Sequence, residues 1–187
     1  MSLFLQTNKV TCDVVEPFQG FDPIAYMGTW YTNAHSKNQP YQPDTWVCTV
    51  AEYSEFNNDT KRFVVKDSLQ TAIGAPRQTI TGEAQCPATG AGDGLCHVSL
   101  YGTTPFDQIN YSVVSTDYTN YSIVYQCAED DMAYIYVMSR TPIMDSDTME
   151  MAKSIIADKL PHYNMDNLYF DTQGDDKCIY PSAEALI

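Results

Sequence analysis

The sequence has no long hydrophobic run and few positive charges. No stretch of about 18 consecutive apolar residues occurs, the length that a membrane-spanning helix requires, so we expect no transmembrane segment. The 187 residues carry 10 Lys and Arg against 24 Asp and Glu, a formal net charge of -14. An acidic surface repels the phosphates of nucleic acids and of anionic lipids. We therefore expect neither nucleic acid nor an anionic membrane surface as a partner.

The sequence also lacks the cysteine patterns of metal and redox sites. There is no Cys-X-X-Cys pair, and no cluster of Cys and His has the spacing of a zinc site. The six cysteines are spread over the whole chain, as is typical of disulfides formed in an oxidising compartment. We expect three disulfides and a secreted, extracellular protein without a metal. The start, Met1 to Leu5, is too short and too poor in basic residues for a complete signal peptide, so we expect a mature form.

No constellation of catalytic residues stands out. The chain lacks a Ser-His-Asp order and a Gly-rich loop that would cradle a phosphate. Asp67 and Asp117 are acid–base candidates, but a turn-capping role explains Asp117 better. We interpret His35 and His162 as surface or rim residues and His97, near the expected rim, as a candidate contact to a ligand carbonyl. The sequence therefore predicts a binding protein and not an enzyme.

Short segments rich in Val, Ile, Thr, Tyr and Phe dominate the chain and are separated by turn residues. Eight such segments with short connections predict an antiparallel meander, which loses its unpaired edges by closing into a barrel. The predicted strands are 30–36, 47–56, 62–69, 78–84, 96–101, 110–116, 121–127 and 132–139.

A helix is expected after this meander. N-cap candidates at Asp145 to Thr148 precede apolar residues that recur every three or four positions, and Pro161 ends the pattern. A short strand over 167–172 follows. The fold class is thus all-β, an eight-stranded up-and-down barrel with one C-terminal helix packed outside. We expect a single domain over 1–187, with the barrel over about 27–140, the helix over about 146–160, and a final strand and disulfide-tethered tail over 165–187.

The chain contains 14 tyrosines, and many alternate along the predicted strands. Tyr111 shares a face with Val113, and Tyr134 shares one with Tyr136 and Met138, because side chains two apart on a strand point to the same side. Each tyrosine could be an ordinary core or surface residue. Together they favour a wall of hydroxyl-tipped rings around an apolar ligand, since a buried phenol needs a polar partner.

Three segments, in order along the chain, resemble the sequence motifs of the lipocalin family. The resemblance implies an eight-stranded barrel with a ligand inside, and an arginine that packs over the first-motif tryptophan at the closed end. Lipocalin enzymes of the isomerase type use a free pocket thiol, which a fully paired set of cysteines would not provide. The motif residues are Gly28 and Trp30, then Thr116, Asp117 and Tyr118, then Arg140.

Within this family, segments 39–42, 81–84 and 116–127 resemble the group of apolipoprotein D, insect bilin-binding proteins and crustacyanin subunits. That resemblance implies two disulfides, which tie the lead segment and the tail to the barrel. Two further cysteines fall outside the group's pattern and bracket a Gly-rich turn, so we expect them to staple a hairpin. The expected pairs are Cys12 with Cys127, Cys48 with Cys178, and Cys86 with Cys96.

The crustacyanin likeness and the many tyrosines favour a carotenoid pigment such as astaxanthin as the ligand. Biliverdin is the first alternative, and a sterol or fatty acid, carried as by apolipoprotein D, is the second. The resemblance also implies that lipocalin subunits could assemble into homo- or hetero-oligomers. The expected ligand-binding residues are Tyr53, Phe63, His97, Tyr111, Tyr125, Tyr134 and Tyr136.

Overall fold

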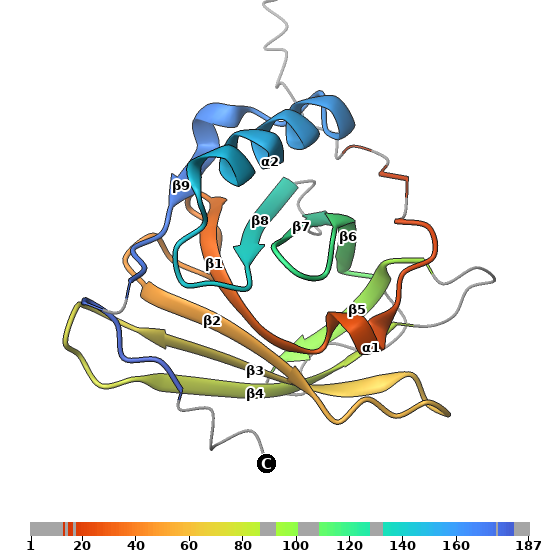
Figure 1. The fold of residues 1–187 in the computed structure, drawn as a ribbon, viewed down its shortest axis with the longest axis horizontal. Helices are drawn as coiled ribbons and strands as arrows, with labels where there is room; N and C mark the ends of the chain where they lie inside the picture. The colour runs from red at the N-terminus through yellow and green to blue at the C-terminus, as the bar shows by residue number, and fades with distance from the viewer. Residues whose placement is uncertain are drawn as a thin grey trace, which may run out of the picture.

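In the computed structural model the chain forms an antiparallel sheet that closes on itself, with a helix packed outside (Figure 1). The structure describes residues 13, 15–16, 18–86, 93–100, 109–127, 133–174 and 176–181. The strands are β1 (Gly28–Ser36), β2 (Val47–Ser54), β3 (Arg62–Gln70), β4 (Gln78–Gln85), β5 (Leu95–Leu100), β6 (Tyr111–Thr116), β7 (Tyr121–Cys127), β8 (Ala133–Ser139) and β9 (Leu168–Phe170). The helices are α1 (Pro23–Tyr26), α2 (Ser146–Lys159) and the 3-10 turn η1 (Met165–Asn167).

The strands follow one another around the barrel in chain order, and pairing of β1 with β2 closes it. The predicted fold class is confirmed, and the eight predicted barrel strands agree closely with β1 to β8. The helical turn α1 was not predicted: Asp22 caps it by accepting hydrogen bonds from the backbone amides of Ile24 and Ala25. Among the described residues, no helix is long and apolar enough to cross a membrane.

Two apolar clusters occupy the two faces of the sheet. The interior cluster fills the closed half of the barrel, and the outer cluster lies between the barrel wall and α2, which crosses outside it (Figure 1). The interior cluster is Phe21, Tyr26, Trp30, Ala51, Tyr53, Phe63, Val65, Ala84, Cys86, Cys96, Val113, Val124 and Met138. The outer cluster is Ala34, Val114, Ile123, Tyr125, Ile135, Val137, Met144, Ala152, Ile156, Leu160, Tyr163 and Leu168.

Strand β1 changes partners along its length. Its first half pairs with β2, ending at Tyr31 opposite Val50, and its second half pairs with β9 beyond an irregularity after Thr32. Where the β1–β2 ladder ends, the side-chain amide of Gln173 donates to the carbonyl oxygens of Thr32 and Thr49, both at 2.8 Å. The segment after β9 therefore joins the two strands at the open end of the barrel.

Two disulfides lie within the described residues: Cys48–Cys178 fixes the tail to β2, and Cys86–Cys96 links the ends of β4 and β5. Both are expected pairs. Cys127 is also disulfide-bonded. Its expected partner, Cys12, lies outside the described residues, so that pairing stays a prediction.

Loss of the tail disulfide should cost more stability than loss of the hairpin disulfide. Cys48 and Cys178 are 130 residues apart, whereas Cys86 and Cys96 are 10 apart. In the chain-entropy model, replacing the first pair by Ser costs about 5 kcal/mol and the second about 3 kcal/mol, because the longer loop restricts the unfolded chain more. Urea unfolding of the two double variants measures both costs. Equal losses would contradict the loop-length explanation.

Candidate ligand-binding site

The closed end of the barrel is built on Trp30 and Arg140. Trp30 is fully buried, and its indole N–H donates to the carbonyl oxygen of Tyr26 at 3.0 Å. The guanidinium carbon of Arg140 lies 3.7 Å from the centroid of the Trp30 ring, a cation–π contact. Gly28 has a φ of +94°, and a Cβ there would lie 3.3 Å from a guanidinium nitrogen of Arg140. Glycine thus permits both the backbone turn and the close approach of the arginine.

The turn between β6 and β7 is held by Asp117. One of its carboxylate oxygens accepts hydrogen bonds from the backbone amides of Thr119, Asn120 and Tyr121. Tyr118 connects this turn to the start of the barrel, because its hydroxyl accepts from the Asp22 amide and its carbonyl accepts from Arg140. The second-motif residues therefore brace the closed end and do not face the ligand space.

A chain of hydroxyl groups lies above this floor, inside the barrel. The Tyr111 hydroxyl lies 3.0 Å from that of Tyr26 and 3.0 Å from that of Tyr53. The Tyr26 hydroxyl also lies 2.7 Å from the Ser122 hydroxyl, and the Tyr26 ring stacks on Tyr53. Burial raises the pKa of Tyr26 to about 12 and raises the pKa of Tyr53 and Tyr111 as well. These phenols therefore keep their protons at neutral pH.

This chain contains one hydroxyl proton more than its internal hydrogen bonds require. Its four groups carry one proton each, and three hydrogen bonds join them within the described part of the protein. When every group donates in the direction of β2, the spare proton is on Tyr53. The inner end of the barrel can therefore donate a hydrogen bond to an acceptor above it.

A second group of polar side chains lies nearer the open end. The Tyr136 hydroxyl donates to the side-chain oxygen of Gln39, a residue of the β1–β2 loop that is 2% exposed. The amide nitrogen of Gln39 is buried and has no hydrogen-bond partner among the described residues. Exchanging the amide oxygen and nitrogen would free the Tyr136 proton instead. In either orientation, the pair keeps an unused donor.

Asp67 is the acidic residue of this region. It follows Phe63 and Val65 at alternate positions of β3 and lies opposite Ala51 of β2 and Ile80 of β4, which places it on the interior face. Asp67 is half-buried, whereas Ala51 beside it is buried. Burial raises the pKa of Asp67 to about 7. Its charge therefore changes near neutral pH.

The structure brings most, but not all, of the predicted ligand-binding residues together. Tyr53 and Phe63 belong to the interior cluster, and Tyr111 and Tyr136 pack against it. Tyr134 lies two positions before Tyr136 on β8 and therefore shares its interior face. The centroid of its ring lies 6.1 Å from that of Tyr41 in the β1–β2 loop, in an edge-on contact.

Two predicted ligand-binding residues lie elsewhere. Tyr125 belongs to the outer cluster, and its hydroxyl donates to the carbonyl oxygen of Asp13. His97 alternates with Cys96 and Val98, which face the interior, and therefore points to the opposite side of β5. We leave both out of the site, since neither faces the interior.

The interior polar residues that were not predicted as ligand contacts include Tyr26, Gln39 and Asp67. The pattern of β3 could have placed Asp67, because it continues the period-two series of Phe63 and Val65. Tyr26 lies in the unpredicted turn α1, and Gln39 lies in a loop whose course no local pattern indicates.

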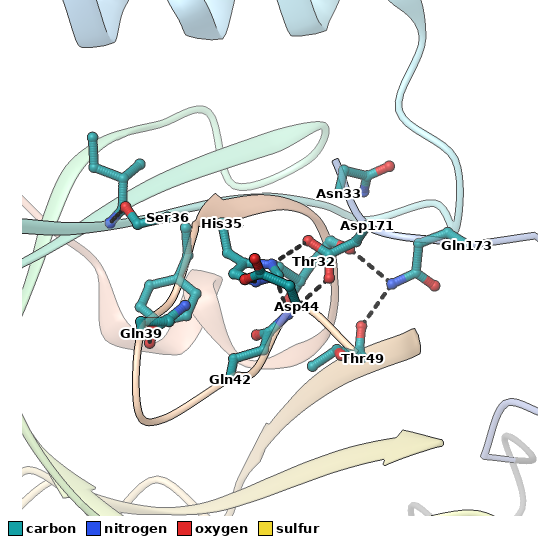
Figure 2. A network of polar contacts seen from close by, with 12 residues as sticks. Thr32, Asn33, His35, Ser36, Gln39, Gln42, Asp44, Thr49, Asp171 and Gln173 are labelled. Carbon is teal, nitrogen blue, oxygen red and sulfur yellow. Dashed lines mark hydrogen bonds and ion pairs between the residues drawn. The ribbon is translucent and has the colours of Figure 1, made fainter. Parts of the chain in front are cut away.

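The expectation that His35 is a surface or rim residue is wrong. Figure 2 shows it at the centre of a polar network, and its side chain is completely buried. His35 Nδ1 lies 2.7 Å from a carboxylate oxygen of Asp171, and Nε2 lies 3.3 Å from Asp44. The side-chain amide of Gln42 donates to the other Asp171 oxygen at 2.8 Å. The network fastens the β1–β2 loop, which carries Gln39, to the segment after β9.

Two curated relatives align with most of the chain. It is 30% identical to the Lazarillo protein of Schistocerca americana over 155 residues, which cover 82% of this chain and 70% of the relative. It is also 30% identical to apolipoprotein D of Macaca fascicularis over 142 residues, which cover 74% of this chain and 70% of the relative.

Solved structures with lower sequence identity share the fold. Insecticyanin from the tobacco hornworm Manduca sexta superposes with a TM-score of 0.69 at 19% identity, covering 90% of this chain and 89% of that one. Apocrustacyanin C1 superposes with a TM-score of 0.65 at 20% identity, covering 83% and 82%. The family model described as a lipocalin-like domain matches residues 21–173. Taken with the closed barrel and the Trp30–Arg140 floor, that match makes the chain a member of the lipocalin family, whose members carry small ligands.

Proposed function

We propose that this lipocalin is a secreted carrier whose barrel holds a carotenoid pigment such as astaxanthin. The observation that carries the proposal is the unused hydrogen-bond donor of the Tyr136–Gln39 pair among the described residues, together with the hydroxyl chain that can place a further donor on Tyr53. A buried donor without a partner is costly. A ligand that supplies an acceptor removes that cost.

Apart from Asp67, the described side chains between these donors are mostly apolar. Val98 and Leu100 of β5 pack against the interior cluster, and Ile80 of β4 faces the same space. An astaxanthin end ring combines a keto oxygen, a hydroxyl group and a hydrocarbon body. The keto oxygen accepts hydrogen bonds from the donors, while the ring and the start of the polyene bury apolar surface.

The visible absorption spectrum of the protein tests the pigment assignment. A protein isolated from its natural source or reconstituted with astaxanthin should show a broad band to the red of the free pigment. Solvent extraction should return the spectrum of the free carotenoid. A colourless protein that does not bind astaxanthin, but binds a sterol or fatty acid, would make it a colourless lipid carrier.

The interior hydroxyl groups should matter for a keto-bearing ligand and not for a plain fatty acid. Replacing Tyr111 and Tyr136 together by Phe should weaken astaxanthin binding about tenfold or more, because it removes two hydroxyl groups from the interior network. Binding of palmitate should change little. Tyr125→Phe is the matched control, since that hydroxyl lies outside the barrel. Equal losses for both ligands would remove the hydroxyls from the proposed site.

Biliverdin is the second candidate because of Asp67. The pyrrole N–H groups of biliverdin are donors, and the ionised carboxylate of Asp67 inside the barrel would accept hydrogen bonds from them. A blue-green protein that releases a bilin on extraction would select this candidate over the carotenoid.

We also propose that subunits associate through the open end. Tyr41, in the β1–β2 loop, is 52% exposed, and its ring contacts Tyr134 of β8. Exposed aromatic side chains at the rim of a site are typical of interfaces. Analytical ultracentrifugation of the wild type and Tyr41→Ser tests this, since an assembly formed at this end should dissociate in the variant.

A further inference from the structure

Asp67 is a carboxyl group on the interior face of β3, and no positive charge in the described part of the chain balances it. Among the described residues, no Lys, Arg or His forms an ion pair with it and no donor forms a hydrogen bond to it. Its neighbours on the adjacent strands are Ala51 of β2 and Ile80 of β4, which carry no polar side-chain atoms. Without a partner among these residues, the ionised form depends on solvent alone for its stabilisation.

The other titratable groups that face Asp67 are phenols. Tyr53 approaches from β2 and Tyr136 from β8, and both interact electrostatically with it. Burial raises the pKa of both tyrosines, so they stay neutral throughout the physiological range. His35 of β1 is bound within its own network by Asp171 and Asp44. Of Asp67 and these two tyrosines, Asp67 is therefore the one whose charge changes near neutral pH.

A neutral ligand removes the solvent from Asp67 when it enters. An ionised carboxylate then loses its hydration and gains no counter-ion, which is costly in an apolar interior. The protonated acid avoids this cost and gains an O–H donor. A carbonyl oxygen on the ligand is the natural acceptor for that donor.

We propose that Asp67 is a ligand-binding residue that takes up a proton when a neutral, carbonyl-bearing ligand enters, and then donates a hydrogen bond to the ligand's carbonyl oxygen. The class of ligand rests on the proposed function. No bond to carbon changes: one solvent proton moves to the carboxylate, and the net charge of the complex rises by one. Binding is thereby linked to pH.

Nile red, a neutral dye with a carbonyl group and fluorescence that responds to polarity, tests the inference without the natural pigment. With Asp67 half-protonated near pH 7, the binding-competent fraction falls roughly tenfold between pH 6 and pH 8, and the apparent Kd should rise by the same factor. Asp67→Asn should bind equally well at both pH values. Glu83→Gln, which removes an exposed carboxylate from the outer face of β4, should keep the wild-type pH dependence.

A second measurement uses the wild type alone. Adding saturating Nile red to the protein in weak buffer at pH 7 should raise the pH, with uptake of roughly half a proton per bound dye. If Nile red binds with no proton uptake and no pH dependence, the inference is overturned. Tighter binding at pH 8 than at pH 6 also overturns it, because Asp67 would then act as an ionised acceptor.

Astaxanthin titrations separate this inference from the proposed function. Failure of astaxanthin to bind at any pH, with a proton-linked Nile red response, removes the pigment assignment and leaves the role of Asp67 standing. If astaxanthin instead binds equally tightly at pH 6 and pH 8, the pigment assignment stands and the proposed role of Asp67 is removed.

Discussion

Replacing Asp67 by Asn should raise the free energy of unfolding at pH 8 by about 4 kcal/mol. The carboxyl has a pKa of about 7 in the folded barrel, against 3.8 as its ordinary value, and each unit of difference corresponds to about 1.4 kcal/mol. Because the folded pKa is raised, the folded chain holds more protons than the unfolded chain between these values. Asp67 therefore lowers stability as the pH rises from about 4 to 7, and its full cost applies above pH 7.

Urea unfolding at pH 5 and pH 8 measures this effect. The wild type should lose stability between these values relative to Asp67→Asn, and the difference between the two proteins should be larger at pH 8. Glu83→Gln controls for the removal of one negative charge from an acidic protein. If Asp67→Asn and Glu83→Gln have the same effect at pH 8, Asp67 is hydrated like a surface carboxylate, contrary to our description of the interior.

Loss of the Arg140 side chain should be the second large effect. Arg140 contacts the Trp30 ring and donates hydrogen bonds to the carbonyl oxygens of Thr29 and Tyr118 at 2.9 Å and of Ala25 at 3.1 Å. It thus holds together α1, β1 and the β6–β7 turn. We expect Arg140→Leu to lower the free energy of unfolding by about 3–5 kcal/mol, from lost charged hydrogen bonds and the cation–π contact.

Two comparisons make this prediction specific. Arg140→Lys keeps the charge but has no planar fork to reach three carbonyl groups, so it should recover only part of the loss. Arg62→Leu removes an arginine whose ion pair with Glu83 spans 3.5 Å between exposed side chains, and should cost less than about 1 kcal/mol. Similar losses for Arg140→Leu and Arg62→Leu in urea unfolding would contradict a structural role for the closed-end arginine.

The sequence predicted the barrel well because its strands have a clear period of two and strong turn signals between them. The same period could not tell the inside from the outside on β7. Ile123 and Tyr125 face α2, while Val124 faces the interior, so both faces of this strand are apolar. Because α2 covers the outer face of this strand, that face is also apolar. The sequence then shows no contrast between a buried and a solvent-exposed face, on which the assignment of inward and outward residues depends.

The polar part of the site was harder to predict, because its contacts join distant parts of the chain. His35 is buried through Asp171, which is 136 positions away, and no local pattern indicates that pairing. Gln39 meets Tyr136 across 97 positions. Asp67 followed an inward series on β3, but a charged residue on a strand is normally expected to face solvent. Its interior position depends on the closure of the barrel around it.

The Gln173 side chain acts as a substitute peptide group in the seam between β1 and β2. Its amide bridges Thr32 and Thr49, and its oxygen accepts from Tyr180, so one residue 124 positions beyond Thr49 completes the circumference at the open end. A cut just before Gln173 would leave every described strand intact, and the Cys48–Cys178 disulfide would still hold the severed segment beside β2. We therefore expect the tail, which lies outside the barrel strands, to contribute to how long a bound ligand is retained.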